Sequence, residues 1–196
     1  MKFLKSNFHE ILKLYINQIG IVIFSLALLF PLEAMGGEEG IQPVWSILAS
    51  VASVIFYYVL IYYVVWDLGA RDKIRIDSGR YEPTPARGAL LGLYANIPNL
   101  ILALPLLVFT VINVLSGACA QVAAIFNLLT RFHSAMYLGT VLGITGFNSD
   151  PSSSVQIVVA ALFVFLPLLS VAITHLAYYL GSREKRILWF LAPKSN

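Results

Sequence analysis

The chain has 196 residues, of which 59% are hydrophobic and only 12% are charged, and its formal net charge is +3. Soluble domains carry about 25% charged residues, so this composition excludes an ordinary soluble globular protein. It predicts one all-α integral membrane domain over residues 1–196, because four membrane spans of roughly 20–25 residues each leave too little chain for a second, soluble domain.

The first predicted span covers residues 14–32. It follows an amphipathic, lysine-containing start, and we expect Pro31 and the glycine-rich stretch after it to end the helix. The connection to the next span carries glutamates and no lysine or arginine. This absence of basic residues indicates an extracytoplasmic connection.

The second predicted span covers residues 43–65 and contains no charged side chain. Trp45 and Trp66 lie near its two ends, and their separation corresponds to about 31 Å of helix. Tryptophan is enriched at both interfaces of a membrane whose hydrocarbon core is about 30 Å thick. The pattern therefore predicts a complete crossing.

The connection 67–87 is rich in basic residues, which favours a cytoplasmic location. Four of these residues are candidate contacts for anionic lipid headgroups: Arg71, Lys73, Arg75 and Arg80. Acidic residues alternate with them, so local salt bridges are the alternative interpretation. Ile74 and Ile76 on one side of Asp77-Ser78-Gly79, with Tyr81 on the other, favour a small β-hairpin within this connection.

The third predicted span covers residues 89–115 and contains two prolines. Its small and polar residues share one helical face: Gly88, Gly92, Asn96, Asn99, Ala103, Thr110 and Asn113. Two interpretations remain open. The stripe can allow close helix packing with amide hydrogen bonds across helices, or it can line a polar cavity.

The segment 118–150 is apolar but contains Arg131, whose insertion at the centre of a span would cost about 2.5–3.5 kcal/mol. We expect it on the extracytoplasmic side, as an additional interfacial or re-entrant helical segment, with a fifth span as the alternative. Asn127, Thr130, Arg131 and Ser134 fall on one face of the expected helix.

The fourth predicted span covers residues 155–179 and completes a four-transmembrane-helix bundle. Its Thr174 and His175 lie at a depth similar to that of Asn96 and Asn99 in the third span. These four residues are our candidates for a polar vestibule that faces the cytoplasm. Helix packing by the two asparagines and an interfacial position of the histidine are the alternatives.

No motif for catalysis, metal binding or nucleotide binding occurs in the chain, and we expect no cofactor. The lone Cys119 excludes an intramolecular disulfide. The basic residues lie beside apolar runs, where they anchor and orient a membrane protein, so we expect the lipid bilayer and not nucleic acid as the partner.

The sequence favours a non-enzymatic accessory or permease-like subunit in the plasma membrane, with both termini in the cytoplasm. Such a subunit would act with another membrane protein or as a homo-oligomer. The alternatives are a small channel or lipid- or solute-binding protein that uses the vestibule, and, least favoured, a membrane enzyme.

Overall fold

The computed structural model describes residues 2–35, 43–80, 82, 84, 86–145 and 152–185, which form eight helices and no strand. The helices, in chain order, are α1 (Lys2–Ser6), α2 (Phe8–Met35), α3 (Pro43–Asp77), α4 (Arg87–Ala95), α5 (Ile97–Ser116), α6 (Ala120–His133), α7 (Ala135–Thr145) and α8 (Ser153–Gly181).

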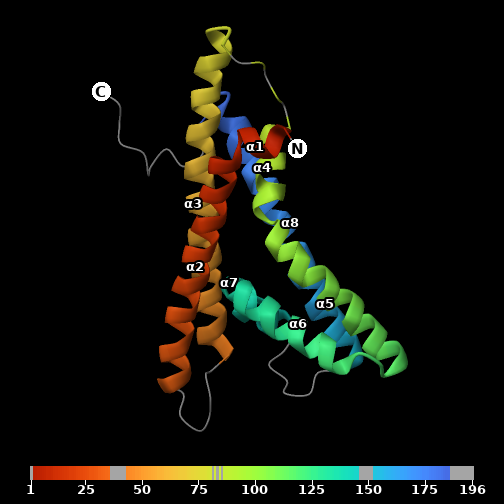
Figure 1. Cartoon of the computed structure of the whole chain (residues 1–196). Coiled ribbons are helices and arrows are strands. Elements are labelled where there is room, and N and C mark those ends of the chain that lie inside the picture. The colour runs from red at the N-terminus through yellow and green to blue at the C-terminus, as the bar shows by residue number, and fades with distance from the viewer. Residues whose placement is uncertain are drawn as a thin grey trace.

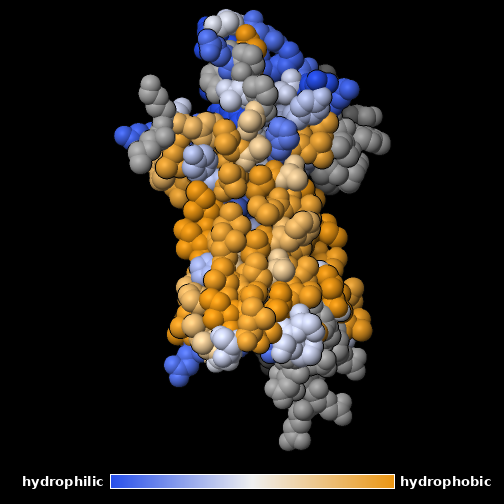
Figure 2. All heavy atoms as spheres, turned by 90° about the vertical axis from the view of Figure 1, so that its right-hand side faces the viewer, coloured by the Kyte–Doolittle hydropathy of each residue, from blue (hydrophilic) through white to orange (hydrophobic). Residues whose placement is uncertain are grey.

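Four of these helices, α2, α3, α5 and α8, are long and apolar enough to cross a membrane. This confirms the prediction of an all-α protein with four helices that have the length and apolar character of membrane spans. Figure 2 shows a broad apolar band across the middle of the molecule, with hydrophilic residues gathered mainly at one end. Such a band is expected where side chains face lipid instead of water.

The helices form a splayed bundle (Figure 1). Helices α2 and α3 lie side by side as one arm, α5 and α8 form the second arm, and the short helices α6 and α7 bridge the two arms. Helix α8 also contacts α3 and α4, so the arms meet at the end of the bundle where α2 begins and α8 ends. We call this the terminal end, and the other the hairpin end.

Helix α2 starts earlier than the predicted span 14–32, at Phe8. It also ends later, at Met35, because it runs unbroken through Pro31. A proline inside a helix removes one backbone hydrogen bond and strains the preceding turn. Here that loss does not stop the helix, so the expectation that Pro31 ends it was wrong. The acidic connection 36–42 lies outside the described residues.

Helix α3 is 35 residues long and continues to Asp77, so the predicted β-hairpin is wrong and 67–77 is helix instead of loop. Ion pairs one turn apart stabilise this solvated extension: Arg71 with Asp67 at 2.6 Å and Lys73 with Asp77 at 2.7 Å. The helix measures about 52 Å, which exceeds the hydrocarbon thickness of about 30 Å. The chain then turns at Gly79, whose φ is +69°.

The third predicted span is interrupted, because α4 and α5 are separated at Asn96. Pro98 explains the break: it has no N–H with which to continue the α4 hydrogen-bond ladder, and it occupies the first turn of α5, where proline is tolerated. At the break, the Asn96 side chain donates from Nδ2 to the Gly92 carbonyl at 2.8 Å, and the Asn96 backbone N–H donates to the same oxygen at 3.1 Å. Only α5 qualifies as a span by its length.

Candidate functional site

Helices α6 and α7 are too short to cross a membrane and form a helical hairpin with its turn at Ser134. Helix α7 runs antiparallel along α3, since Met136 contacts Ser50 while Gly143 lies against Ile47, nearer the start of α3. The hairpin therefore begins and ends at the hairpin end of the bundle (Figure 1). This geometry rules out a fifth span within the described residues.

Close backbone contact holds α7 on α3. The Ser50 hydroxyl donates to the Met136 carbonyl at 2.6 Å, and the Thr140 amide donates back to Ser50 Oγ at 3.1 Å. A Cβ on Gly139 would lie 2.1 Å from the Ser46 carbonyl oxygen, so only glycine permits this approach. The turn of the hairpin also reaches α2, where the rings of His133 and Tyr15 lie 6.0 Å apart.

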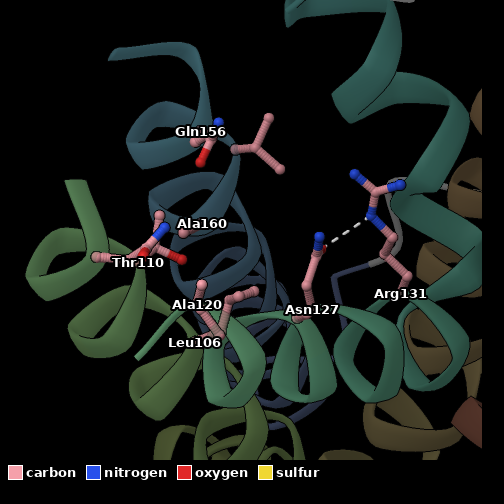
Figure 3. A pocket seen from close by; sticks show the side chains of 11 residues that line it. Leu106, Thr110, Ala120, Asn127, Arg131, Gln156 and Ala160 are labelled. Carbon is pink, nitrogen blue, oxygen red and sulfur yellow. Dashed lines mark hydrogen bonds between the residues drawn. The ribbon is translucent and has the colours of Figure 1, made fainter. Parts of the chain in front are cut away.

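A cavity of about 430 Å³ lies between α5, α6 and α8. Its polar lining comes from all three helices: Thr110 and Asn113 on α5, Asn127 and Arg131 on α6, and Gln156 on α8 (Figure 3). We call it the Arg131 cavity. Asn113 and Gln156 lie within three residues of helix ends, so the cavity reaches the hairpin end of the bundle.

Among the described residues that line this cavity, Arg131 alone is charged. Its Nε donates to Asn127 Oδ1 at 2.9 Å, which fixes the orientation of the guanidinium. It forms no ion pair with any residue that the structure describes. Burial lowers the pKa of Arg131, but an arginine side chain keeps its charge in proteins. The site therefore combines a fixed positive charge with uncharged amide and hydroxyl groups.

The polar face predicted on the segment 118–150 divides in the structure. Asn127 and Arg131 line the Arg131 cavity, whereas Thr130 and Ser134 are buried in the bundle. The contribution of Gln156 was missed by the sequence analysis. The available signal was a glutamine near the start of α8, directly before an apolar run.

Three of the four predicted vestibule residues are brought together, but they fill a packing interface. Asn96, Asn99 and Thr174 are each no more than 3% exposed. Asn96 Nδ2 donates to Ser170 Oγ at 2.7 Å, and Asn99 Nδ2 donates to Asn96 Oδ1 at 2.9 Å. This chain of hydrogen bonds links α5 to α8.

His175 is separated from that group. It is exposed and lines a different cavity at the terminal end, together with Lys73 and Arg183. The small and polar stripe of the third span thus serves two purposes. Gly88, Gly92 and Asn96 pack against α8, while Thr110 and Asn113 line the Arg131 cavity.

The predicted lipid contacts Arg71, Lys73, Arg75 and Arg80 do not form one site. Arg71 lines a cavity of about 150 Å³ between α2 and α3, whereas Lys73 lines the cavity that contains His175. Arg75 and Arg80 are exposed. The ion pairs with Asp67 and Asp77 agree with the alternative interpretation of local salt bridges.

A buried ionic group that the sequence analysis did not identify joins three helices near the terminal end. Arg87 Nη1 donates to Asp72 Oδ2 at 2.5 Å, and the Tyr178 hydroxyl donates to the same oxygen at 2.9 Å. Both charged side chains are at most 5% exposed. Charges at this burial are stable only when they are paired and hydrogen-bonded.

Comparisons of the chain with protein-family models, with curated proteins and with solved structures found no match.

Proposed function

We propose that this chain is a non-enzymatic, permease-like membrane subunit that binds a small anionic solute in the Arg131 cavity. The observation that supports this most is the placement of Arg131, a charged side chain on a hairpin inside a membrane bundle. It faces a polar cavity to which the described residues contribute no carboxylate. Charged side chains among membrane helices are costly and usually mark substrate or ion paths.

The lining suits an anion. A guanidinium carries five N–H donors and no acceptor, and within the described part of the chain the Arg131 guanidinium donates from Nε to Asn127. The hydroxyl of Thr110 and the amide of Asn113 can add neutral donors around a bound oxyanion, and Gln156 completes the polar lining. The volume of about 430 Å³ lies within the usual range of roughly 300–1,000 Å³ for small-molecule sites.

The side of the membrane follows from charge. Basic residues flank the terminal end, on the α3 extension and after α8, and the positive-inside rule favours that end in the cytoplasm. Under this orientation both termini are cytoplasmic, and the Arg131 cavity faces the extracytoplasmic side of the plasma membrane. The polar vestibule expected from sequence, in contrast, was expected to face the cytoplasm.

The role as a subunit rests on size. Four spans that enclose separate cavities at their two ends offer little surface for an alternating carrier on their own, and known carriers often use internal repeats. We therefore expect the chain to work with a membrane-protein partner or as a homo-oligomer.

Anion titration of the purified full-length chain tests the proposal. Sulfate, phosphate, acetate and chloride are titrated at constant ionic strength while binding is followed by calorimetry. At least one anion should bind, and Arg131→Gln should weaken it by about 1.5–3 kcal/mol, which is roughly a ten- to hundredfold loss of affinity. The anion affinity of Arg131→Lys should lie between that of the wild-type chain and that of Arg131→Gln, because lysine keeps the charge and loses the guanidinium fork.

The matched control is Arg71→Gln, which removes one arginine at the opposite end of the bundle and outside the lining. It should leave anion affinity unchanged. Equal affinities for the wild-type chain and Arg131→Gln would contradict the proposal.

A further inference from the structure

A second cavity, of about 620 Å³, lies at the terminal end of the bundle. It is formed by the last turns of α3, by Thr84 and Ala86 ahead of α4, and by the end of α8. It lies at the other end of the bundle from the Arg131 cavity and shares no lining residue with it. We call it the Arg183 cavity.

The charged groups of the Arg183 cavity sit at its outer edge. The Arg183 guanidinium lies 4.3 Å from the centre of the Tyr179 ring, a contact that positions the cation while leaving its N–H groups available. Lys73 Nζ donates to both carboxylate oxygens of Asp77 at 2.7 and 3.0 Å, which leaves one of its three N–H groups. Two cations therefore border this cavity, one of them already oriented by a carboxylate.

The inner edge of the Arg183 cavity continues into a lipid-facing surface. His175 lies six residues before the end of α8, about 9 Å deeper along the helix axis than that end. Exposed apolar residues of α8 lie on either side of His175 along the helix: Leu168 lies deeper in the span, while Leu176 and Tyr179 lie nearer the helix end, and each is at least 40% exposed. Their spacing places them on one side of α8, so a track of apolar side chains, with His175 among them, runs from the middle of the span to the two cations.

This arrangement, with an apolar track below and cations above, matches the shape of a phospholipid. We propose that the Arg183 cavity seats the headgroup of an anionic membrane phospholipid, with Arg183 and Lys73 contacting its phosphate and one acyl chain lying along the Leu168–Tyr179 face of α8. A free phosphate ion shares the headgroup chemistry but makes no use of the apolar track. The site also differs from the one expected from sequence, because Lys73 is joined by Arg183 instead of by Arg71, Arg75 and Arg80.

Lipid retention by the full-length chain tests this assignment. The chain is purified in detergent and mixed with dioleoylphosphatidylglycerol or dioleoylphosphatidylcholine, and bound lipid is counted by native mass spectrometry. The wild-type chain should retain phosphatidylglycerol in preference to phosphatidylcholine. Arg183→Gln and Lys73→Gln should each lower phosphatidylglycerol retention about fivefold, as expected for one basic residue beside an anionic headgroup.

Two further variants sharpen the result. Arg71→Gln removes the same charge at the same end of the bundle but outside the Arg183 cavity, so its retention should match the wild type. Asp77→Asn removes the one carboxylate among the described lining residues and should raise retention. This gain of binding keeps the test decisive even if Arg183→Gln fails to fold.

Three outcomes would overturn the assignment. One is equal retention of the two lipids by the wild-type chain. Another is an equal loss of phosphatidylglycerol retention in Arg71→Gln and Arg183→Gln, which would mean that diffuse surface charge attracts the lipid. The third is complete displacement of phosphatidylglycerol by millimolar inorganic phosphate, which would mean that the cavity recognises a free anion.

Discussion

Asp72 and Arg87 form a buried ion pair, with 2.5 Å between Asp72 Oδ2 and Arg87 Nη1, that joins the end of α3 to the start of α4. Tyr178 adds α8 to the same carboxylate. The pair spans the chain reversal between the second and third predicted spans. It therefore ties together the three helices that meet at the terminal end.

Removing one member of this pair should destabilise the bundle strongly, because the other charge stays buried and loses its short hydrogen bond. Without Arg87, Asp72 would keep the longer ion pair of its Oδ1 with Arg75 Nη1, at 3.9 Å. We expect Asp72→Asn and Arg87→Gln each to cost about 3–5 kcal/mol of unfolding free energy. Tyr178→Phe should cost about 0.5–1.5 kcal/mol, as one hydrogen bond is lost. Unfolding of the purified chain by a denaturing detergent measures all three.

A double variant, Asp72→Asn with Arg87→Met, provides the control for that experiment, since it leaves no buried charge. It should be more stable than Arg87→Met alone. Additive losses from the two single changes would contradict direct coupling of these side chains.

The close approach of α7 to α3 should depend on Gly139. Gly139→Ala places a methyl group 2.1 Å from the Ser46 carbonyl oxygen, and since a backbone atom cannot yield cheaply, we expect a loss of about 1–3 kcal/mol. Gly20→Ala is the control, because nothing lies within 4 Å of the added Cβ. Alanine there should stabilise α2 by about 0.5–1 kcal/mol. The melting temperature should therefore fall in Gly139→Ala and rise in Gly20→Ala. An unchanged melting temperature in Gly139→Ala would argue against the close packing of α7 on α3.

The polar stripe of the third span should separate into two functional halves. Asn99→Ala should lower stability by about 1 kcal/mol, because it removes a donor to buried Asn96, while anion affinity stays unchanged. Asn113→Ala, in the lining of the Arg131 cavity, should weaken anion binding several-fold with little effect on stability. Calorimetric titration and thermal unfolding on the same samples make the comparison. Similar effects of Asn99→Ala and Asn113→Ala on both stability and anion affinity would contradict the division of the stripe into a packing half and a binding half.

Membrane orientation can be tested through Cys119, which is exposed and precedes α6 at the hairpin end of the bundle. An impermeant maleimide added to intact cells should label Cys119, as should a cysteine at exposed Ser153 in a Cys119→Ser background. In the same Cys119→Ser background, a cysteine at Ser78, in the turn after α3, should react only after permeabilisation. Labelling of Ser78→Cys in intact cells would invert the proposed orientation.

Local sequence was sufficient for the elements that face lipid. The uncharged stretch 43–65 and the apolar stretch 155–179 predicted α3 and α8 because a membrane span needs only length and hydrophobicity, both of which are properties of consecutive residues. Local sequence was less reliable for the positions at which these helices begin and end. The α3 extension depends partly on Gly69, where a Cβ would meet the Tyr178 carbonyl oxygen of α8, a contact that no local pattern reveals.

The sequence by itself determined that this is a four-span, all-helical membrane protein, since the transfer of each apolar stretch into lipid is decided residue by residue. Only the tertiary structure decided what the polar residues do. It paired Asp72 with Arg87, buried Asn96 and Asn99 against α8, and set Arg131 opposite Gln156 in a cavity. A charge inside a membrane can be paired, hydrogen-bonded or left facing a cavity, and that choice depends on residues far away in the chain that only folding brings near.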